Sequence, residues 1–229
     1  MTPKRVLIVG GGSSGWMAAA YLDAALNVGS ERAVDISLLE SPDVPRIGVG
    51  EATIPSINHI LAAIRIDEKD FMRRTEGTFK QAIKFTNWLE EKDAGYYHAF
   101  GRYKPTPIDD SGLRWLMSDR SVPFMETISA QPRICEWNLA PQMLGRWDFG
   151  AKLTYAFHMN ALHFADYLCE IATSRGVTHH LDHMTDIEMR DNGDIAAVNT
   201  RGGLRLEADL FIDCTGFAAL LIEKQLGVK

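Results

Sequence analysis

Two short apolar runs near the start of the chain each end in residues that favour a sharp change of direction. The first run, Val6–Val9, is unbroken and β-branched, which predicts a buried parallel strand. The second run, 34–39, alternates apolar and polar residues and ends at Glu40, which predicts a second strand. The residues 17–26 between them are rich in alanine and leucine and predict a helix. This order predicts an α/β fold built on a parallel sheet.

Later stretches of the chain also show either helical or alternating spacing of apolar residues. Apolar residues at helical spacing predict helices at 56–64, at 68–74 and from Asn160 to near Gly176. An alternating stretch, 79–85, predicts one strand with Lys80 and Lys84 on the same face, and its period favours neither lysine as catalytic. Further strands are predicted at 177–181, 184–189, 195–198, 204–208 and 210–213, the second and third joined as a hairpin by the turn at 191–194.

The first strand runs into three glycines with a spacing that has a known chemical use. Gly10, Gly12 and Gly15 form G-x-G-x-x-G directly before a helix, the dinucleotide-binding fingerprint. The first glycine allows the tight turn, the second admits a pyrophosphate and the third lets the helix pack on the strand. Glu40 at the end of the second strand is placed to accept the ribose hydroxyls of an adenosine, although a solvated charge is its simpler interpretation.

Two irregular stretches lie between the elements. Prolines and glycines in 41–50 indicate a loop, which we interpret as lying against the cofactor with Arg46 near its oxygens; a surface Ω-loop is the alternative. The aromatic stretch 90–107 suits stacking on a planar ligand, but its pattern alone favours a satellite hydrophobic cluster. Residues 109–148 show no clear period and predict loops and short helices over a substrate side.

Composition narrows the class of protein. The chain has 229 residues, a net charge of −6 and 46% hydrophobic residues, which is typical of a globular protein and argues against nucleic acid as a partner. No segment approaches the length of a membrane span. Three widely spaced cysteines indicate reduced thiols and a cytoplasmic location. His179, His180 and His183 lack a completing ligand set, so we expect a solvated strand edge and no metal site.

Five segments together resemble the flavin-dependent tryptophan halogenase family. They are GGGSSGWMAA (10–19), PRIGVGEATIP (45–55), FKQAIKFTNW (79–88), YHAFG (97–101) and EADLFIDCTG (207–216). The second and third are more specific than the glycine fingerprint. The resemblance spans the chain, with a poorly matched middle from about 104 to 152.

The resemblance implies a Rossmann-like FAD-binding fold of the glutathione-reductase type, with an inserted substrate-side region at about 86–155. Family members use FADH2, O2 and chloride or bromide to make hypohalous acid, which reaches a lysine beside an indole-type aromatic substrate. A separate flavin reductase supplies the FADH2, and a homodimer is possible. The implied function is halogenation of tryptophan, indole or a related compound.

The resemblance also assigns residues to these roles. Lys80 matches the catalytic lysine, while His98 and Phe100 match the residues that sandwich the indole ring. The expected FAD-binding residues are Gly10, Gly12, Ser13, Ser14, Gly15, Glu40, Arg46, Ala52, Met184, Asp213 and Gly216.

Other classes of protein share some of these motifs. An FAD-dependent aromatic monooxygenase would share the glycine fingerprint and the strand predicted at 210–213. A catalytically inert FAD-binding fragment is a third interpretation. A nicotinamide dehydrogenase is less favoured, because it would give residues 46–55 no role. The family's W-x-W-x-I-P motif is absent from these residues, and family chains are about twice as long. The sequence therefore resembles an N-terminal half, which we expect to be inactive if the molecule ends at Lys229.

Overall fold

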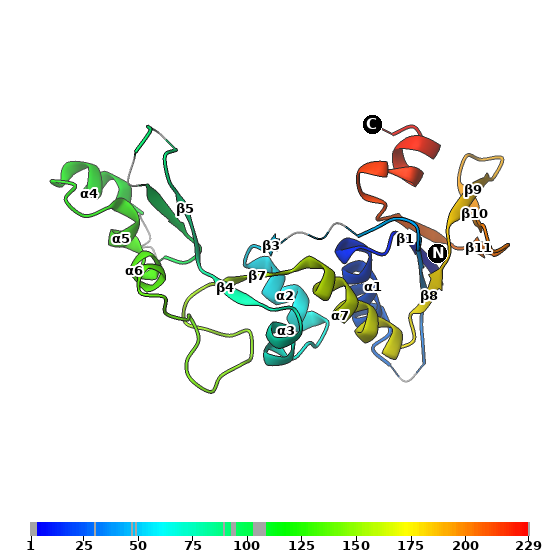
Figure 1. Cartoon of the computed structure of the whole chain (residues 1–229), viewed down its shortest axis with the longest axis horizontal. Coiled ribbons are helices and arrows are strands. Elements are labelled where there is room, and N and C mark those ends of the chain that lie inside the picture. The colour runs from blue at the N-terminus through cyan, green and yellow to red at the C-terminus, as the bar shows by residue number, and fades with distance from the viewer. Residues whose placement is uncertain are drawn as a thin grey trace.

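The computed structural model describes residues 4–29, 31–46, 48, 50–88, 90–92, 95–102 and 109–228. Its shape is elongated (Figure 1). A parallel sheet with its covering layers lies at one end, a smaller sheet with α2 and α3 lies in the middle, and a loosely packed outer lobe forms the other end. We define the outer lobe as β5, β6 and α4–α6.

The parallel sheet has the strand order β12-β1-β2-β8. These strands are Leu210–Asp213, Arg5–Val9, Asp35–Glu40 and Thr178–Leu181. The apolar residues of β1 are at most 4% exposed, because both faces of the sheet are covered. This confirms the predicted buried strand, and β12, which lies at the strand predicted at 210–213, pairs with β1 in the same sheet.

Helices cover one face of this sheet and a β-meander covers the other. Helices α1 (Ser13–Leu26) and α7 (Ala161–Ser174) pack together over Val6 and Ile8. Leu7 and Val9 point the other way and pack with apolar residues of the meander. The meander has the order β11-β10-β9, with bounds Arg205–Glu207, Ile195–Thr200 and Met184–Met189, and contains the predicted hairpin.

The middle sheet has the order β3-β7-β4 and was only partly predicted. Its strands are Gly50–Ala52, Ala156–Asn160 and Thr78–Lys80, and only the last overlaps a predicted strand, the one at 79–85. Helices α2 (Ser56–Ala63) and α3 (Glu68–Arg74) pack beside it, at the predicted positions. By strand alternation, Phe157 and Met159 share one face of β7, while Ala156, His158 and Asn160 share the other, on which Ala156 is buried and His158 is exposed.

The single strand predicted at 79–85 is wrong, because the chain changes sheets at Gln81. β4 ends at Lys80, and β5 (Ala82–Phe85) pairs instead with β6 (Tyr96–Ala99). Gln81 is 6% exposed, its carbonyl accepts from Phe100 N at 3.0 Å, and its side-chain Nε2 donates to Leu139 O at 2.7 Å. These bonds draw the chain away from β7 into the outer lobe.

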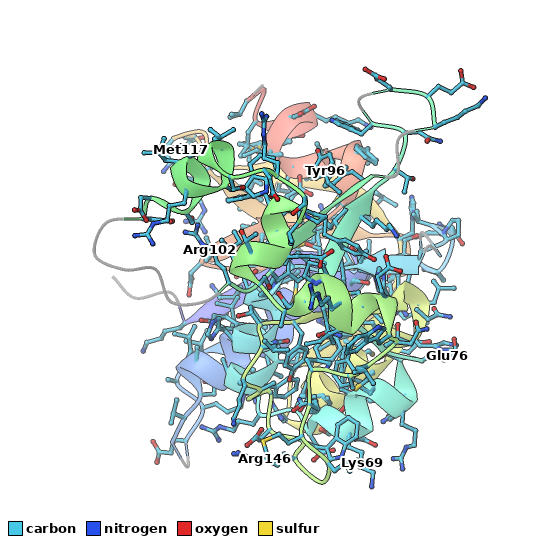
Figure 2. All side chains as sticks on the ribbon, turned by 90° about the vertical axis from the view of Figure 1, so that its left-hand side faces the viewer. Lys69, Glu76, Tyr96, Arg102, Met117 and Arg146 are labelled. Atoms are coloured by element: carbon cyan, nitrogen blue, oxygen red, sulfur yellow. The ribbon has the colours of Figure 1, made fainter. Side chains whose placement is uncertain are left out.

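The rest of the outer lobe consists of loops and short helices, as predicted. The helices are α4 (Ser111–Met117), α5 (Phe124–Ile128) and α6 (Gln131–Glu136). Seen from this end of the molecule, Met117 and Tyr96 lie at the upper edge of the view and Arg102 lies below them (Figure 2). The chain after β12 forms a 3-10 turn, Gly216–Ala218, and a π-helical turn, Leu220–Gln225. Among the described residues, no helix is long and apolar enough to cross a membrane.

Candidate functional site

The glycine turn has room for a side chain at Gly12 but not at Gly10 or Gly15. A Cβ at Gly10, whose φ is +119°, would lie 2.1 Å from Cys214 O, and a Cβ at Gly15 would lie 1.9 Å from Gly10 O. A Cβ at Gly12 would meet nothing within 4 Å. No side chain caps the start of α1, so its first N–H groups face this open space. The turn therefore fits the pyrophosphate of a dinucleotide such as FAD.

The two serines that follow tie the turn to its neighbours. Ser13 Oγ donates to Ala161 O at 3.2 Å, and Ser14 Oγ donates to the Cys214 sulfur at 3.7 Å. Burial raises the pKa of the Cys214 thiol, so this thiol stays protonated at neutral pH. The side chains of both serines are thus used within the fold, and the cofactor contacts expected of them rest on their backbone amides.

Glu40 lies at the end of β2 and forms a two-bonded ion pair that the sequence did not reveal. Arg46 Nε donates to Glu40 Oε1 at 2.7 Å and Arg46 Nη2 donates to Oε2 at 2.9 Å. Arg46 Nη1 also donates to Asp166 Oδ1 at 2.5 Å, which attaches the 41–50 loop to α7. Both residues expected at the cofactor therefore lie together beside the glycine turn, where a Cβ on Gly11 would clash with Glu40.

His179 corrects the expectation of a solvated strand edge. Its Nε2 lies 3.1 Å from Glu40 Oε2, and its ring packs edge-on against Trp16 with centroids 4.8 Å apart. The side chain is 24% exposed. β8 is the edge strand of its sheet, but this imidazole faces the carboxylate of the neighbouring strand. Within the described ranges, no cluster of three or more His, Cys, Asp or Glu residues could hold a metal.

The turn after β12 is shaped by Asp213. Its Oδ1 accepts from Thr215 N and Oγ1, and its Oδ2 accepts from Leu221 N and Ile222 N. Burial raises the pKa of Asp213, but these hydrogen bonds together hold it below its usual range. Gly216 follows with φ +63°, a conformation that glycine adopts without strain. Asp213 thus holds the loop that closes over Gly10.

Met184 and Ala52 lie on strands at either side of the parallel sheet. Met184 begins β9, opposite Thr200, and packs against the apolar cluster that contains Leu7 and Val9. Ala52 ends β3 and is exposed, opposite His158 of β7.

Lys80 is buried in the middle sheet. It is 9% exposed, Nζ donates to Thr53 O at 3.0 Å, and Nζ lies 5.4 Å from the centroid of the Phe100 ring. Lys80 pairs with Ala156 and Ala52 pairs with His158 in the register, so Lys80, His158 and Ala52 share one face of the middle sheet. The residue expected to cover the flavin and the expected catalytic lysine therefore lie on one sheet face.

His158 contributes an uncharged imidazole to this face. Burial lowers its pKa, and the Lys80 ammonium lowers it further. The residue also lines a cavity of about 410 Å³ between the 45–55 loop and the middle sheet. Its other lining residues are Gly48, Gly50, Glu76, Thr78, Met159, Asn160 and Leu162. His158 was not predicted as a site residue, because its place on this face depends on β7, a strand that the sequence pattern did not indicate.

The two residues expected to sandwich the substrate are two positions apart, one on β6 and one directly after it. His98 pairs with Ile83 and its side chain is exposed, whereas Phe100 comes directly after the strand and is partly buried beside Lys80. The structure brings Phe100 to the lysine, and His98 remains at the surface of the outer lobe.

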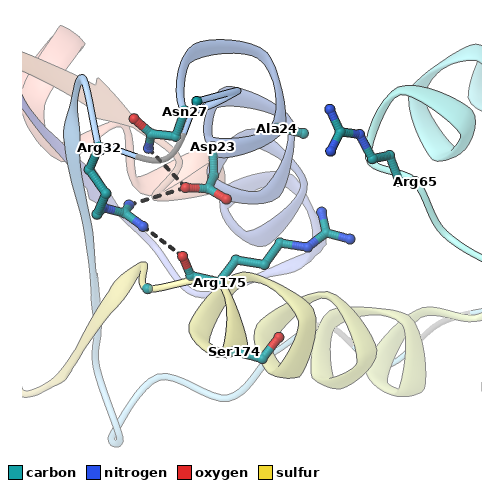
Figure 3. A pocket seen from close by; sticks show the side chains of 9 residues that line it. Asp23, Ala24, Asn27, Arg32, Arg65, Ser174 and Arg175 are labelled. Atoms are coloured by element: carbon teal, nitrogen blue, oxygen red, sulfur yellow. Dashed lines mark hydrogen bonds and ion pairs between the residues drawn. The ribbon is translucent and has the colours of Figure 1, made fainter.

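A larger cavity, of about 610 Å³, lies away from all of these residues. It is at the C-terminal ends of α1 and α7 (Figure 3). Arg32 pairs with Asp23 at 3.1 Å and donates to Arg175 O at 2.6 Å, and Arg175 donates to Ile64 O at 2.6 Å. These arginines bind carbonyls at helix C-termini, which is a common structural use of the residue. The cavity is therefore not part of the candidate site.

Comparisons with known proteins agree with this geometry. The tryptophan halogenase family profile matches residues 5–229. Tryptophan 7-halogenase RebH of Lentzea aerocolonigenes is 39% identical, with 97% of this chain covering 44% of the relative. Tryptophan 6-halogenase ThaL of Streptomyces albogriseolus is 34% identical, with 97% of this chain covering 44% of the relative.

Solved structures show the same similarity. The tryptophan halogenase of Shewanella frigidimarina superposes with a TM-score of 0.92 at 36% identity, with 100% of this chain covering 45% of that chain. Xcc4156, a flavin-dependent halogenase of Xanthomonas campestris, superposes with a TM-score of 0.85 at 35% identity, with 99% of this chain covering 45% of that chain. The chain thus spans less than half the length of these relatives, and its Rossmann-like fold is theirs. This chain belongs to the tryptophan halogenase family.

Proposed function

We propose that this chain supplies the FAD-binding and lysine-bearing part of a flavin-dependent halogenase that acts on tryptophan, indole or a related aromatic. The observation that carries the proposal is the shared sheet face of Ala52, His158 and buried Lys80. Strands lie about 4.8 Å apart, so a path along this face from β3 to β4 is about 10 Å long.

The cofactor end of this path is built by the glycine turn. Reduced FAD with O2 and a halide would supply hypohalous acid, with a separate flavin reductase providing the FADH2. The open space at Gly12 and the uncapped start of α1 would bind the pyrophosphate. Glu40 Oε2 already accepts from Arg46 and Trp16, so Glu40 would accept a ribose hydroxyl at Oε1, which accepts one bond from Arg46.

The substrate end is built by Lys80 and Phe100. The ammonium of Lys80 would donate a hydrogen bond to the hypohalous acid in place of Thr53 O, and so favour transfer of the halogen to carbon. The ring carbon gains the halogen and loses a proton, and the oxygen leaves as water. The Phe100 ring beside Nζ would stack on the substrate and bring it to the halogen.

The test is to incubate the protein with FAD, a flavin reductase, NADH, bromide and tryptophan or indole, and to measure product mass. A product with the bromine isotope pattern supports the proposal. A product that gains one oxygen would assign the protein to the aromatic monooxygenases. Bound FAD with no product would indicate an inert cofactor-binding chain.

A further inference from the structure

One fully buried polar side chain joins the segment that carries Phe100 to the segment that leads into β7, the strand that pairs with Lys80. Gln131, the first residue of α6, is 0% exposed. Its Oε1 accepts from Gly101 N at 2.5 Å, and its Nε2 donates to Thr154 O at 2.5 Å. Both halves of the amide are therefore used, and each bonds to the backbone of a different segment.

Each bonded segment leads directly to the candidate site. Gly101 follows Phe100, and Thr154 lies two residues before Ala156, which pairs with Lys80 in the middle sheet. Phe100 N itself donates to Gln81 O, the residue after Lys80. The backbone around Phe100 is thus fixed at two successive amides, one bonded to the lysine strand and one bonded to Gln131.

The packing at Gly101 leaves little freedom for this segment. A Cβ on Gly101 would lie 3.2 Å from Gln131 Oε1 and 3.5 Å from Thr154 N. The three residues are therefore in direct contact, and a change at position 131 would move residue 101. Phe100 would move with it, because the two are joined by a peptide bond.

We propose that Gln131 is a positioning residue that fixes the Phe100 ring relative to Lys80, and thereby fixes which carbon of the aromatic substrate meets the halogen. The proposal rests on the proposed function, since it concerns the same site. Gln131 touches neither Lys80 nor the substrate in this account and acts through Gly101. An error of about 1 Å in such positioning is enough to lower the rate of a reaction substantially.

The test compares two glutamine-to-methionine variants in the bromination of tryptophan. Gln131→Met keeps the side-chain length and removes both hydrogen bonds. Gln142→Met is the matched control, because Gln142 Nε2 donates to Glu68 and to Tyr155 OH, away from Gly101. We expect Gln131→Met to raise KM about tenfold, with kcat changed less, and to broaden the ratio of product regioisomers. Gln142→Met should lower Tm but keep the wild-type ratio.

Gln131→Glu provides a rescue that depends on pH. A protonated carboxyl accepts from Gly101 N and donates to Thr154 O as the amide does, whereas an ionised carboxylate cannot donate. Compared with the wild type at each pH, its regioisomer ratio should approach the wild-type value as the pH falls. A role in stability alone would change Tm with pH without changing the ratio.

Hydrogen exchange at the Gly101 amide gives a readout that does not depend on activity. Gln131→Met should speed this exchange and Gln142→Met should not. An active wild type with an unchanged KM and ratio in Gln131→Met, or an equal change in both variants, would overturn the positioning role. A wild type that yields no halogenated product would instead overturn the proposed function.

Discussion

Lys80 and Lys84 lie four residues apart in the sequence but belong to different sheets, one on each side of the break at Gln81. Lys80 is buried with its Nζ beside the Phe100 ring. Lys84 is 42% exposed and pairs with Glu136 at 2.5 Å, while Tyr97 OH donates to the same carboxylate. The alternation of the sequence placed both lysines on one face, and the structure separates them.

This separation makes the two lysines a matched pair for mutation. Lys80→Ala should abolish halogenation and leave FAD binding intact, because Lys80 shares no contact with the glycine turn. Lys84→Ala should retain activity, since a solvent-exposed ion pair contributes little to stability. Product mass and FAD titration of both variants provide the measurement. Halogenation by Lys80→Ala would show that this lysine is not catalytic.

Substitutions within the glycine turn should separate cofactor binding from folding. Gly12→Val should fold, with a loss of about 1 kcal/mol at the helix N-cap, because its side chain enters open space. It should lower FAD affinity by at least about tenfold, or about 1.4 kcal/mol. Gly10→Ala should instead fail to fold stably, because its Cβ would overlap Cys214 O. Thermal melts and FAD titrations distinguish the two effects, and an unchanged affinity in Gly12→Val would remove the pyrophosphate assignment.

The Arg46 ion pairs should control the order of the 41–50 loop. Arg46→Gln leaves Glu40 without its two-bonded partner and frees the loop from Asp166. We expect faster proteolytic cleavage in this loop and FAD affinity reduced by about tenfold, or about 1.4 kcal/mol. Arg201→Gln is the control, because Arg201 pairs with Asp43 of the same loop at the surface. Equal cleavage rates in wild type and Arg46→Gln would contradict this role.

Asp213→Asn should destabilise the protein in a pH-dependent way. The asparagine amide can replace only some of the four accepted hydrogen bonds, so we expect a loss of about 2 kcal/mol at neutral pH. The folded-state pKa of Asp213 is lowered, so the carboxylate contributes its full stability above the unfolded pKa. That contribution is lost as the pH falls through the lowered pKa. Denaturant unfolding at several pH values should show that the difference in free energy of unfolding between wild type and variant decreases in acid. A difference that stays constant with pH would refute this role of the Asp213 carboxylate.

Local patterns predicted the elements whose identity depends on near neighbours. The strand β1, the glycine turn between β1 and α1, and the hairpin turn at 191–194 each depend on signals within a few residues, and the structure contains all three at the predicted places. α3 was predicted to the residue, because its cap Asp67 and its charged ends are local signals.

Several features that depend on distant partners were not predicted. β3 has three residues and exists only because it pairs with β7, more than a hundred residues later. The break at Gln81 depends on Phe100 and Leu139, and the setting of His179 depends on Glu40. No local period encodes such contacts, so the common face of Ala52, His158 and Lys80 could not be read from the sequence.

The contact between Gly10 and Cys214 has a consequence for the order of folding. The fingerprint lies at the start of the chain, but its turn packs against a loop that is synthesised about two hundred residues later. β1 likewise lacks one neighbour until β12 is available. On a ribosome, the glycine turn therefore emerges before the middle sheet and the outer lobe, and its contact with the loop after β12 forms only after both have been translated. Contacts of such high sequence separation slow folding, so newly made chains should pass through a stage that cannot yet retain the cofactor.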